Sequence, residues 1–324
     1  MVYIREDDPK TIIRFQPKFA REYGYNIYFT RGTVVNRVQA RASIVYAGKF
    51  MDNYNIFHLT GHDVYINQME PDDHSYRLAQ ACSKAFYPLV LICDASGKII
   101  GLLYEQIKER WRREKPLIVR EFGGEYAERY IKVVERSIND PQKIIDIISK
   151  NLFFHTFFMP RYALRTDMDR EVEVTIPLIP FQDSLLGTGI QRYVVTDENE
   201  RKLYCKGAVT DERIFNYEQI LRTRKDEGEG IITGEVEVEY DVSEDGLIDG
   251  VTFDANLSKE NGEPLLDVKM VAYYLPEYPL LIIEDDDILL LEEKIRKEQK
   301  AEEKAKKRRK SLWERFMDYL EEPL

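Results

Sequence analysis

The sequence has few cysteines, no export signal and no long apolar run. Its 324 residues contain only Cys82, Cys93 and Cys205, an odd number at wide spacing. This spacing fits neither a disulfide framework nor a zinc cluster, so we expect three reduced thiols. Charged residues at positions 5–8 occupy the place where a signal peptide needs apolar side chains, and no stretch reaches the roughly 18 apolar residues of a membrane span. These absences predict a cytoplasmic protein.

Local motifs of catalysis are missing as well. The chain has no GxSxG, HExxH, paired CxxC or P-loop lysine. The glycine-containing segments 185–191 and 228–234 do not lie between a strand and a helix, as a phosphate-binding loop does. We therefore predict a protein that is not an enzyme and needs no cofactor. A hydrolase whose residues come together from distant loops remains an alternative, because such a set leaves no local motif.

Charge of both signs is abundant but unevenly distributed. The net charge is −11, although residues 294–310 hold ten Lys and Arg against three Glu. The body of the chain is therefore strongly acidic, which disfavours nucleic acid and anionic membranes as partners.

Strands are predicted in the first part of the chain by alternation of apolar and polar side chains. The pattern runs through residues 25–68, with β-branched and aromatic residues at every second position over much of its length. Residues 88–104 add two strands around a turn at Asp94–Gly97, where an acidic residue, serine and glycine favour a hairpin. We expect an antiparallel sheet with one buried face.

A helical period replaces this alternation in the middle of the chain. A short helix over 73–86 precedes it, and apolar residues at helical spacing predict two helices over 104–115 and 126–138. Asp140 as N-cap and Pro141 as first helical residue predict a third helix that runs to Phe158. Glutamate pairs such as Glu235 and Glu237 belong to a later region of period two, where six strands between 171 and 275 indicate a second antiparallel sheet.

The predicted fold class is α+β, with two antiparallel, half-barrel-like β-sheets, a helical layer between them in sequence, and a C-terminal helical arm. Segment 240–253 repeats the turn pattern of 92–104, through either duplication or common hairpin chemistry. The predicted units are a sheet and helical block over 1–170, a second sheet over 171–284, a charged helical linker over 285–310 and an amphipathic helix over 311–324.

Histidines and phenylalanines offer two candidate sites. His58 and His62 are four residues apart, with His74 further on, but strand residues at that spacing lie about 13 Å apart, so we expect no metal site. Four phenylalanines at the end of the helical block are either core or the lining of an apolar ligand pocket: Phe153, Phe154, Phe157 and Phe158. In the first case, His155 is a core histidine with a backbone partner.

The C-terminal segment provides the clearest interaction signal. Its basic patch consists of Lys306, Lys307, Arg308, Arg309 and Lys310, and we expect this patch mainly to keep an exposed helix soluble. Beyond it, one apolar stripe is formed by Leu312, Trp313, Phe316, Met317 and Leu320. A short helix of this kind is marginal alone and favours a partner surface. Docking on its own body, self-association and membrane-surface insertion are the alternatives.

Together these patterns predict a cytoplasmic scaffold, adaptor or chaperone-like protein that binds a protein partner through its terminal helix. The second hypothesis is a carrier or sensor of a small apolar ligand in a half-barrel pocket.

Overall fold

A computed structural model describes residues 20–50, 54–69, 73–159, 169–177, 184–196, 200–221, 228–244 and 246–277, together with Lys297, Lys300 and Lys304. Eleven strands form one antiparallel sheet in the order β5-β4-β3-β2-β1-β13-β12-β11-β8-β7-β6. Their bounds are β1 (Ala20–Arg31), β2 (Val34–Phe50), β3 (Tyr54–Ile66), β4 (Leu89–Cys93), β5 (Ile99–Leu102), β6 (Asp169–Pro177), β7 (Ser184–Val195), β8 (Arg201–Val209), β11 (Ile232–Val242), β12 (Ile248–Lys259) and β13 (Pro264–Tyr274). Two short strands, β9 (Phe215–Asn216) and β10 (Glu229–Gly230), pair with each other.

The prediction of two separate sheets is wrong. Strand β1 pairs with β13 through eight residue pairs, from Tyr23 opposite Tyr274 to Thr30 opposite Asp267. This ladder joins the N-terminal strands to the C-terminal strands, so the segments predicted as separate units over 1–170 and 171–284 contribute to the same sheet. A free strand edge carries unpaired N–H and C=O groups, and pairing the edges of the two halves satisfies them.

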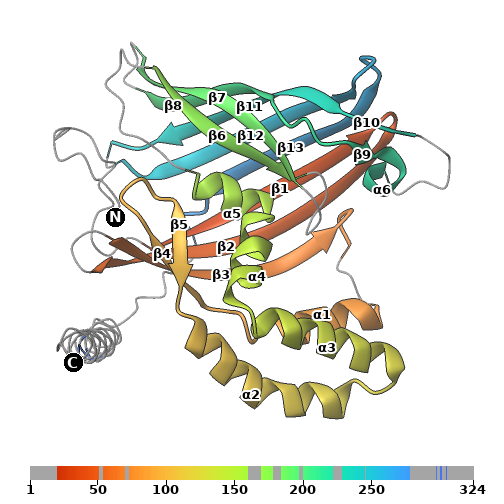
Figure 1. Cartoon of the computed structure of the whole chain (residues 1–324). Helices are drawn as coiled ribbons and strands as arrows, with labels where there is room; N and C mark the ends of the chain where they lie inside the picture. Colours follow the sequence, from red (N-terminus) through yellow and green to blue (C-terminus); the bar gives the residue numbers. More distant parts are fainter. Residues whose placement is uncertain are drawn as a thin grey trace, which may run out of the picture.

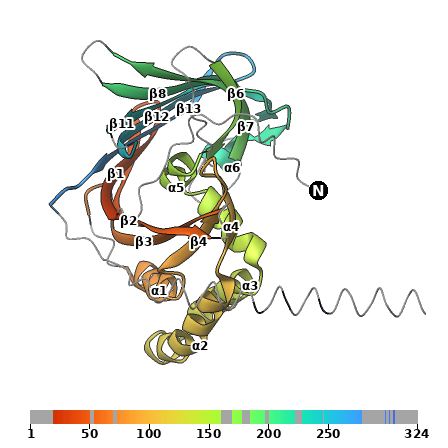
Figure 2. The same ribbon diagram turned by 90° about the vertical axis from the view of Figure 1, so that its left-hand side faces the viewer.

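The helices do not form a layer between two sheets. Helices α1 (His74–Ser83), α2 (Tyr104–Glu121) and α3 (Glu125–Ile138) lie together at the opposite end of the molecule from β6–β8 (Figure 1). Helix α4 (Pro141–Ser149) leads from this group to α5 (Leu152–Phe157), around which the sheet curves (Figure 2). A further short helix, α6 (Tyr217–Leu221), follows β9.

The predicted third helix is two helices, because Asn151 interrupts it. The Asp140 side chain accepts hydrogen bonds from the N–H groups of Gln142 and Lys143, which confirms this residue as the N-cap of α4. Asn151 caps α5 in the same way by accepting from the Phe154 N–H at 3.1 Å. An asparagine at a cap competes with the helical backbone for its hydrogen bonds and so ends one helix and begins another.

Aromatic contacts hold α5 inside the curved sheet. The ring of Phe153 stacks on Tyr25 at 4.5 Å between centroids, and Phe157 meets Tyr23 edge-on at 5.2 Å. The Tyr240 hydroxyl, from β11, donates to the Thr156 carbonyl at 2.7 Å. Helix α5 therefore fills the centre of the core and contacts strands from both halves of the sheet.

The other face of the C-terminal strands is charged, as the alternation predicts. On β11, Val236 and Val238 are buried, whereas Glu237 pairs with Lys206 of β8 at 2.8 Å. Such exposed cross-strand ion pairs contribute little to stability individually, and they keep this face of the sheet polar.

The three cysteines are free and buried, in agreement with the predicted reduced state. Burial raises the pKa of Cys82 and of Cys205 to about 11. Both thiols are therefore protonated and poorly nucleophilic near neutral pH.

The two predicted hairpins have the same type of turn but do not occupy equivalent positions in the sheet. In the β4–β5 turn, Asp94 N–H donates to Lys98 C=O and Gly97 N–H to Asp94 C=O. The β11–β12 and β12–β13 turns repeat this pattern around Ser243 and Lys259, with a glycine of positive φ in the same position. The same turn thus occurs three times, at different distances from the central β1–β13 pair of the sheet. This favours common hairpin chemistry over duplication.

Replacing Gly97 by alanine is expected to lower the free energy of unfolding by about 1 kcal/mol, because φ at this residue is +91°. Chemical denaturation measures the change. Gly123→Ala is the matched control, since Gly123 has no positive φ and nothing lies within 4 Å of an added Cβ. Equal stabilities of the two variants would contradict the assigned turn.

Candidate functional site

A cavity of about 490 Å³ lies between strands β1–β3 and helix α1, and we call it the α1 cavity. Its floor is the same face of the sheet that contacts α5. Tyr25 and Ile27 of β1 stand opposite Ala40 and Val38 of β2, so alternate residues of both strands face the cavity. Val64 of β3 continues this surface, which is mostly apolar.

Helix α1 and the segment that follows it form the roof of the α1 cavity. Asp73 caps α1 by accepting from the Tyr76 N–H at 2.7 Å. The Tyr76 hydroxyl donates to the Val64 carbonyl at 3.3 Å and so ties the start of the helix to β3. Ala79 and Ser83, further along α1, complete the lining from this side.

An arginine of α2 fixes the segment between α1 and β4. The guanidinium group of Arg110 donates to the carbonyls of Ala85, Phe86 and Pro88 at 2.9–3.0 Å. Burial lowers the pKa of Arg110, although this group stays charged at any physiological pH. Three charge-assisted hydrogen bonds to neighbouring carbonyls hold Tyr87, which lies between these residues, against the cavity.

Two tyrosine hydroxyls mark one end of the α1 cavity. The Tyr87 hydroxyl lies over Gly61 of β3, where an added Cβ would approach it to 3.1 Å. Gly61 thus leaves the space that this hydroxyl occupies. Burial raises the pKa of Tyr87 to about 12 and that of Tyr25 further still. Both phenols are therefore protonated near neutral pH and retain a proton to donate.

Charged side chains at the α1 cavity are not balanced. The Asp63 carboxylate accepts a hydrogen bond from Arg41 Nε at 3.0 Å and is thereby paired. Lys150, between α4 and α5, borders the same cavity and forms no ion pair with any residue that the structure describes. Lys150 is therefore the lining charge whose ammonium remains available to a ligand, as judged from the described residues.

A polar cluster on the same strands includes His62, which also borders the α1 cavity. Ser43 Oγ is 2.5 Å from Glu22 Oε2 and 2.8 Å from His62 Nε2. Glu22 also pairs with Arg41 at 3.3 Å. Ser43 then donates to Glu22, and His62 Nε2 carries the proton that it donates to Ser43. In a catalytic triad the histidine instead accepts the serine proton, so this arrangement does not activate Ser43 as a nucleophile.

The histidines are not gathered into a metal site. His62 contacts Ser43, while His74 lies at the start of α1 with its ring 5.3 Å from that of Phe122. His58 stands opposite Val45 and Val90 in the sheet. Within the ranges that the structure describes, no group of three or more His, Cys, Asp or Glu side chains is placed to hold a metal ion.

The four phenylalanines proposed as a pocket all lie in the core. Their exposed fractions are 0–3%, and Phe158 packs edge-on against Phe57 of β3. The neighbouring Leu152 reaches the α1 cavity, whereas the phenylalanines fill the centre of the sheet. The predicted partner-binding stripe and basic patch, residues 306–320, fall outside the described residues.

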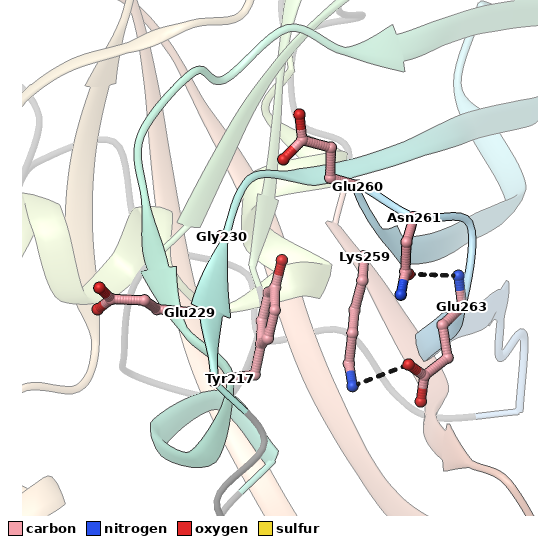
Figure 3. A pocket seen from close by; sticks show the side chains of 8 residues that line it. Tyr217, Glu229, Gly230, Lys259, Glu260, Asn261 and Glu263 are labelled. Carbon is pink, nitrogen blue, oxygen red and sulfur yellow. Dashed lines mark hydrogen bonds and ion pairs between the residues drawn. The ribbon is translucent and has the colours of Figure 1, made fainter.

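A second hollow, of about 470 Å³, lies beside Tyr217 and Lys259 (Figure 3). Lys259 pairs with Glu263 at 3.2 Å and its ammonium lies 5.4 Å from the centre of the Tyr217 ring. Figure 3 shows Glu229 and Glu260 pointing away from this lysine. The polar groups of this hollow do not converge on a common point, so we consider the α1 cavity the better candidate.

Sequence reasoning missed the α1 cavity because its lining comes from segments far apart in the chain. Two local signals were present. Gly61 interrupts an otherwise β-branched and aromatic strand, and glycine in a strand often marks the close approach of another group. Small residues at Ala40 and Ala79 leave space where larger apolar residues usually fill a core.

No protein-family model matches the sequence, and no curated protein matches it significantly. Of the helices that lie in the described ranges, none is both long and apolar enough to span a membrane. Functional interpretation therefore rests on the chemistry of the cavity itself.

His155 of α5, predicted to be a core histidine with a backbone partner, has one ring nitrogen without a partner among the described residues. This nitrogen, Nε2, is buried, and burial lowers the pKa of the imidazole to about 4. In the unfolded chain this imidazole binds a proton near pH 6.5, whereas in the folded protein it does so only near pH 4. The free energy of unfolding is therefore highest above pH 6.5 and declines as the pH falls toward 4.

We expect the free energy of unfolding to fall by up to ~3 kcal/mol more in the wild type than in His155→Gln between pH 7 and pH 4. Denaturation curves at several pH values measure this difference. His74→Gln, at an exposed position, should retain the wild-type dependence. Identical pH profiles for His155→Gln and the wild type would contradict the assignment.

Proposed function

We propose that this protein binds a small apolar ligand in the α1 cavity and acts as a carrier or sensor of that ligand. The observation that carries the proposal is the mostly apolar cavity of about 490 Å³ between β1–β3 and α1. Its volume lies within the range of roughly 300–1,000 Å³ typical of small-molecule sites.

The construction of the cavity supports this proposal. Its floor is a hydrogen-bonded sheet, and its roof is fixed by the Tyr76–Val64 hydrogen bond and by Arg110. A cavity held open in this way leaves apolar side chains such as Ile27 and Val38 without packing partners on one side. An apolar ligand supplies those contacts and removes apolar surface from water, which is favourable at about 25 cal/mol per Å².

The adaptor role through Trp313 and its neighbours remains a prediction from the sequence. Because residues 306–320 lie outside the described ranges, the α1 cavity is the stronger basis for a functional proposal. The two roles are compatible, since a sensor needs both a ligand site and a partner surface.

Titration with the neutral fluorescent probe N-phenyl-1-naphthylamine tests the proposal. We expect saturable binding at one site per chain. Ala79→Phe, which places a large side chain in the cavity, should weaken probe binding at least about tenfold without lowering the melting temperature. The probe should also stabilise the wild type by roughly 2.7 kcal/mol at 100 times its Kd.

Ala208→Phe is the matched control, because Ala208 is exposed on β8 and does not line the cavity. It should bind the probe as the wild type does. Absence of saturable binding, or equal binding by Ala79→Phe and the wild type, would refute the proposal.

A further inference from the structure

The α1 cavity has two chemically different ends. Along β1, Tyr25 stands opposite Ala40, and Ile27, one step further, stands opposite Val38. Val38 in turn stands opposite Ile66 of β3. One end is therefore marked by Tyr25 and the other by aliphatic side chains, with Ile66 itself 43% exposed.

Polar groups gather at the Tyr25 end. The Tyr25 hydroxyl shares a hydrogen bond with Asn151, and its proximity to Tyr87 contributes to its raised pKa. Lys150 is the neighbour of Asn151 in the chain and borders the cavity too. Two hydroxyls and one amide thus come together from β1, from the segment before β4 and from the α4–α5 connection, and Lys150 borders the same cavity.

The unused hydrogen-bonding capacity at this end includes two donors, on Tyr87 and Lys150. Asn151 Oδ1 already accepts from the Phe154 N–H, and the Ser83 hydroxyl donates to the Gln80 carbonyl at 2.8 Å. The Tyr87 hydroxyl and the Lys150 ammonium form no hydrogen bond or ion pair with the described residues. A ligand group that accepts hydrogen bonds and carries negative charge complements these two donors.

We infer that the ligand is an amphiphilic monocarboxylate, with its carboxylate at Lys150 and Tyr87 and its apolar chain running along Ile27 and Val38 toward Ile66. This inference rests on the proposed function, because it assigns a ligand class to the α1 cavity. A carboxylate supplies acceptors for the Tyr87 hydroxyl and the Lys150 ammonium. The aliphatic end accommodates a chain that emerges at the exposed Ile66.

The test compares two probes that differ only in head-group charge: 11-(dansylamino)undecanoic acid and its methyl ester, each titrated at pH 7.5. The wild type should bind the acid at least about tenfold more tightly than the ester. Lys150→Met should remove most of this preference by weakening the acid about tenfold while leaving the ester unchanged. Tyr87→Phe should weaken the acid by a smaller factor.

Lys84→Met is the matched control, since Lys84 is exposed at the end of α1 and does not line the cavity. It should retain the full preference for the acid. The wild-type comparison needs no variant, so it remains decisive even if Lys150→Met fails to fold. Equal affinity for the acid and the ester would overturn the carboxylate assignment and leave the proposed function standing. Absence of binding by both probes would overturn both.

Discussion

The pairing of β1 with β13 is the constraint on which the rest of the structure depends. Each strand begins or ends a run of strands joined by local turns, and without this ladder each would present an open edge. Once they pair, β1 becomes a central strand with neighbours on both sides. Tyr23 and Tyr25 of that strand then form the surface on which α5 packs.

The position of α5 has consequences for the cavity as well as for the core. Phe153 covers Tyr25, so α5 occupies the centre of the curved sheet and leaves the adjoining part of β1–β3 to be covered by α1. The two helices therefore divide one face of the sheet. The part under α5 is filled by aromatic rings, whereas the part under α1 retains unfilled space because small residues line it. Close packing is the norm in protein interiors, so a retained space of this size favours a ligand site over an imperfect core.

The two polar groupings near β1–β3 differ in how far their hydrogen-bonding capacity is used. In the first, Glu22, Arg41, Ser43 and His62 contact one another. In the second, Tyr87 and Lys150 form no hydrogen bond or ion pair with the part of the chain that the structure describes. Donors beside an apolar surface are the more informative feature, because they can bind and orient the polar group of an otherwise apolar ligand.

The sequence by itself determined the local elements: strands where apolar residues alternate, the hairpin turn at Gly97, the N-cap at Asp140 and three buried, free cysteines. These features depend on neighbours a few residues away, which a single sequence displays. It did not reveal the break at Asn151, because helical apolar spacing continues across that residue.

Only the tertiary structure decided that the strands form one sheet and that Tyr25, Gly61, Tyr87 and Lys150 meet at one cavity. Strand pairing depends on backbone groups that every residue shares. The alternation in β1 and β13 therefore shows that each strand has a buried face, but it does not show which strand pairs with which. The cavity lining likewise comes from segments whose proximity is set by that pairing, which the order of residues along the chain does not record.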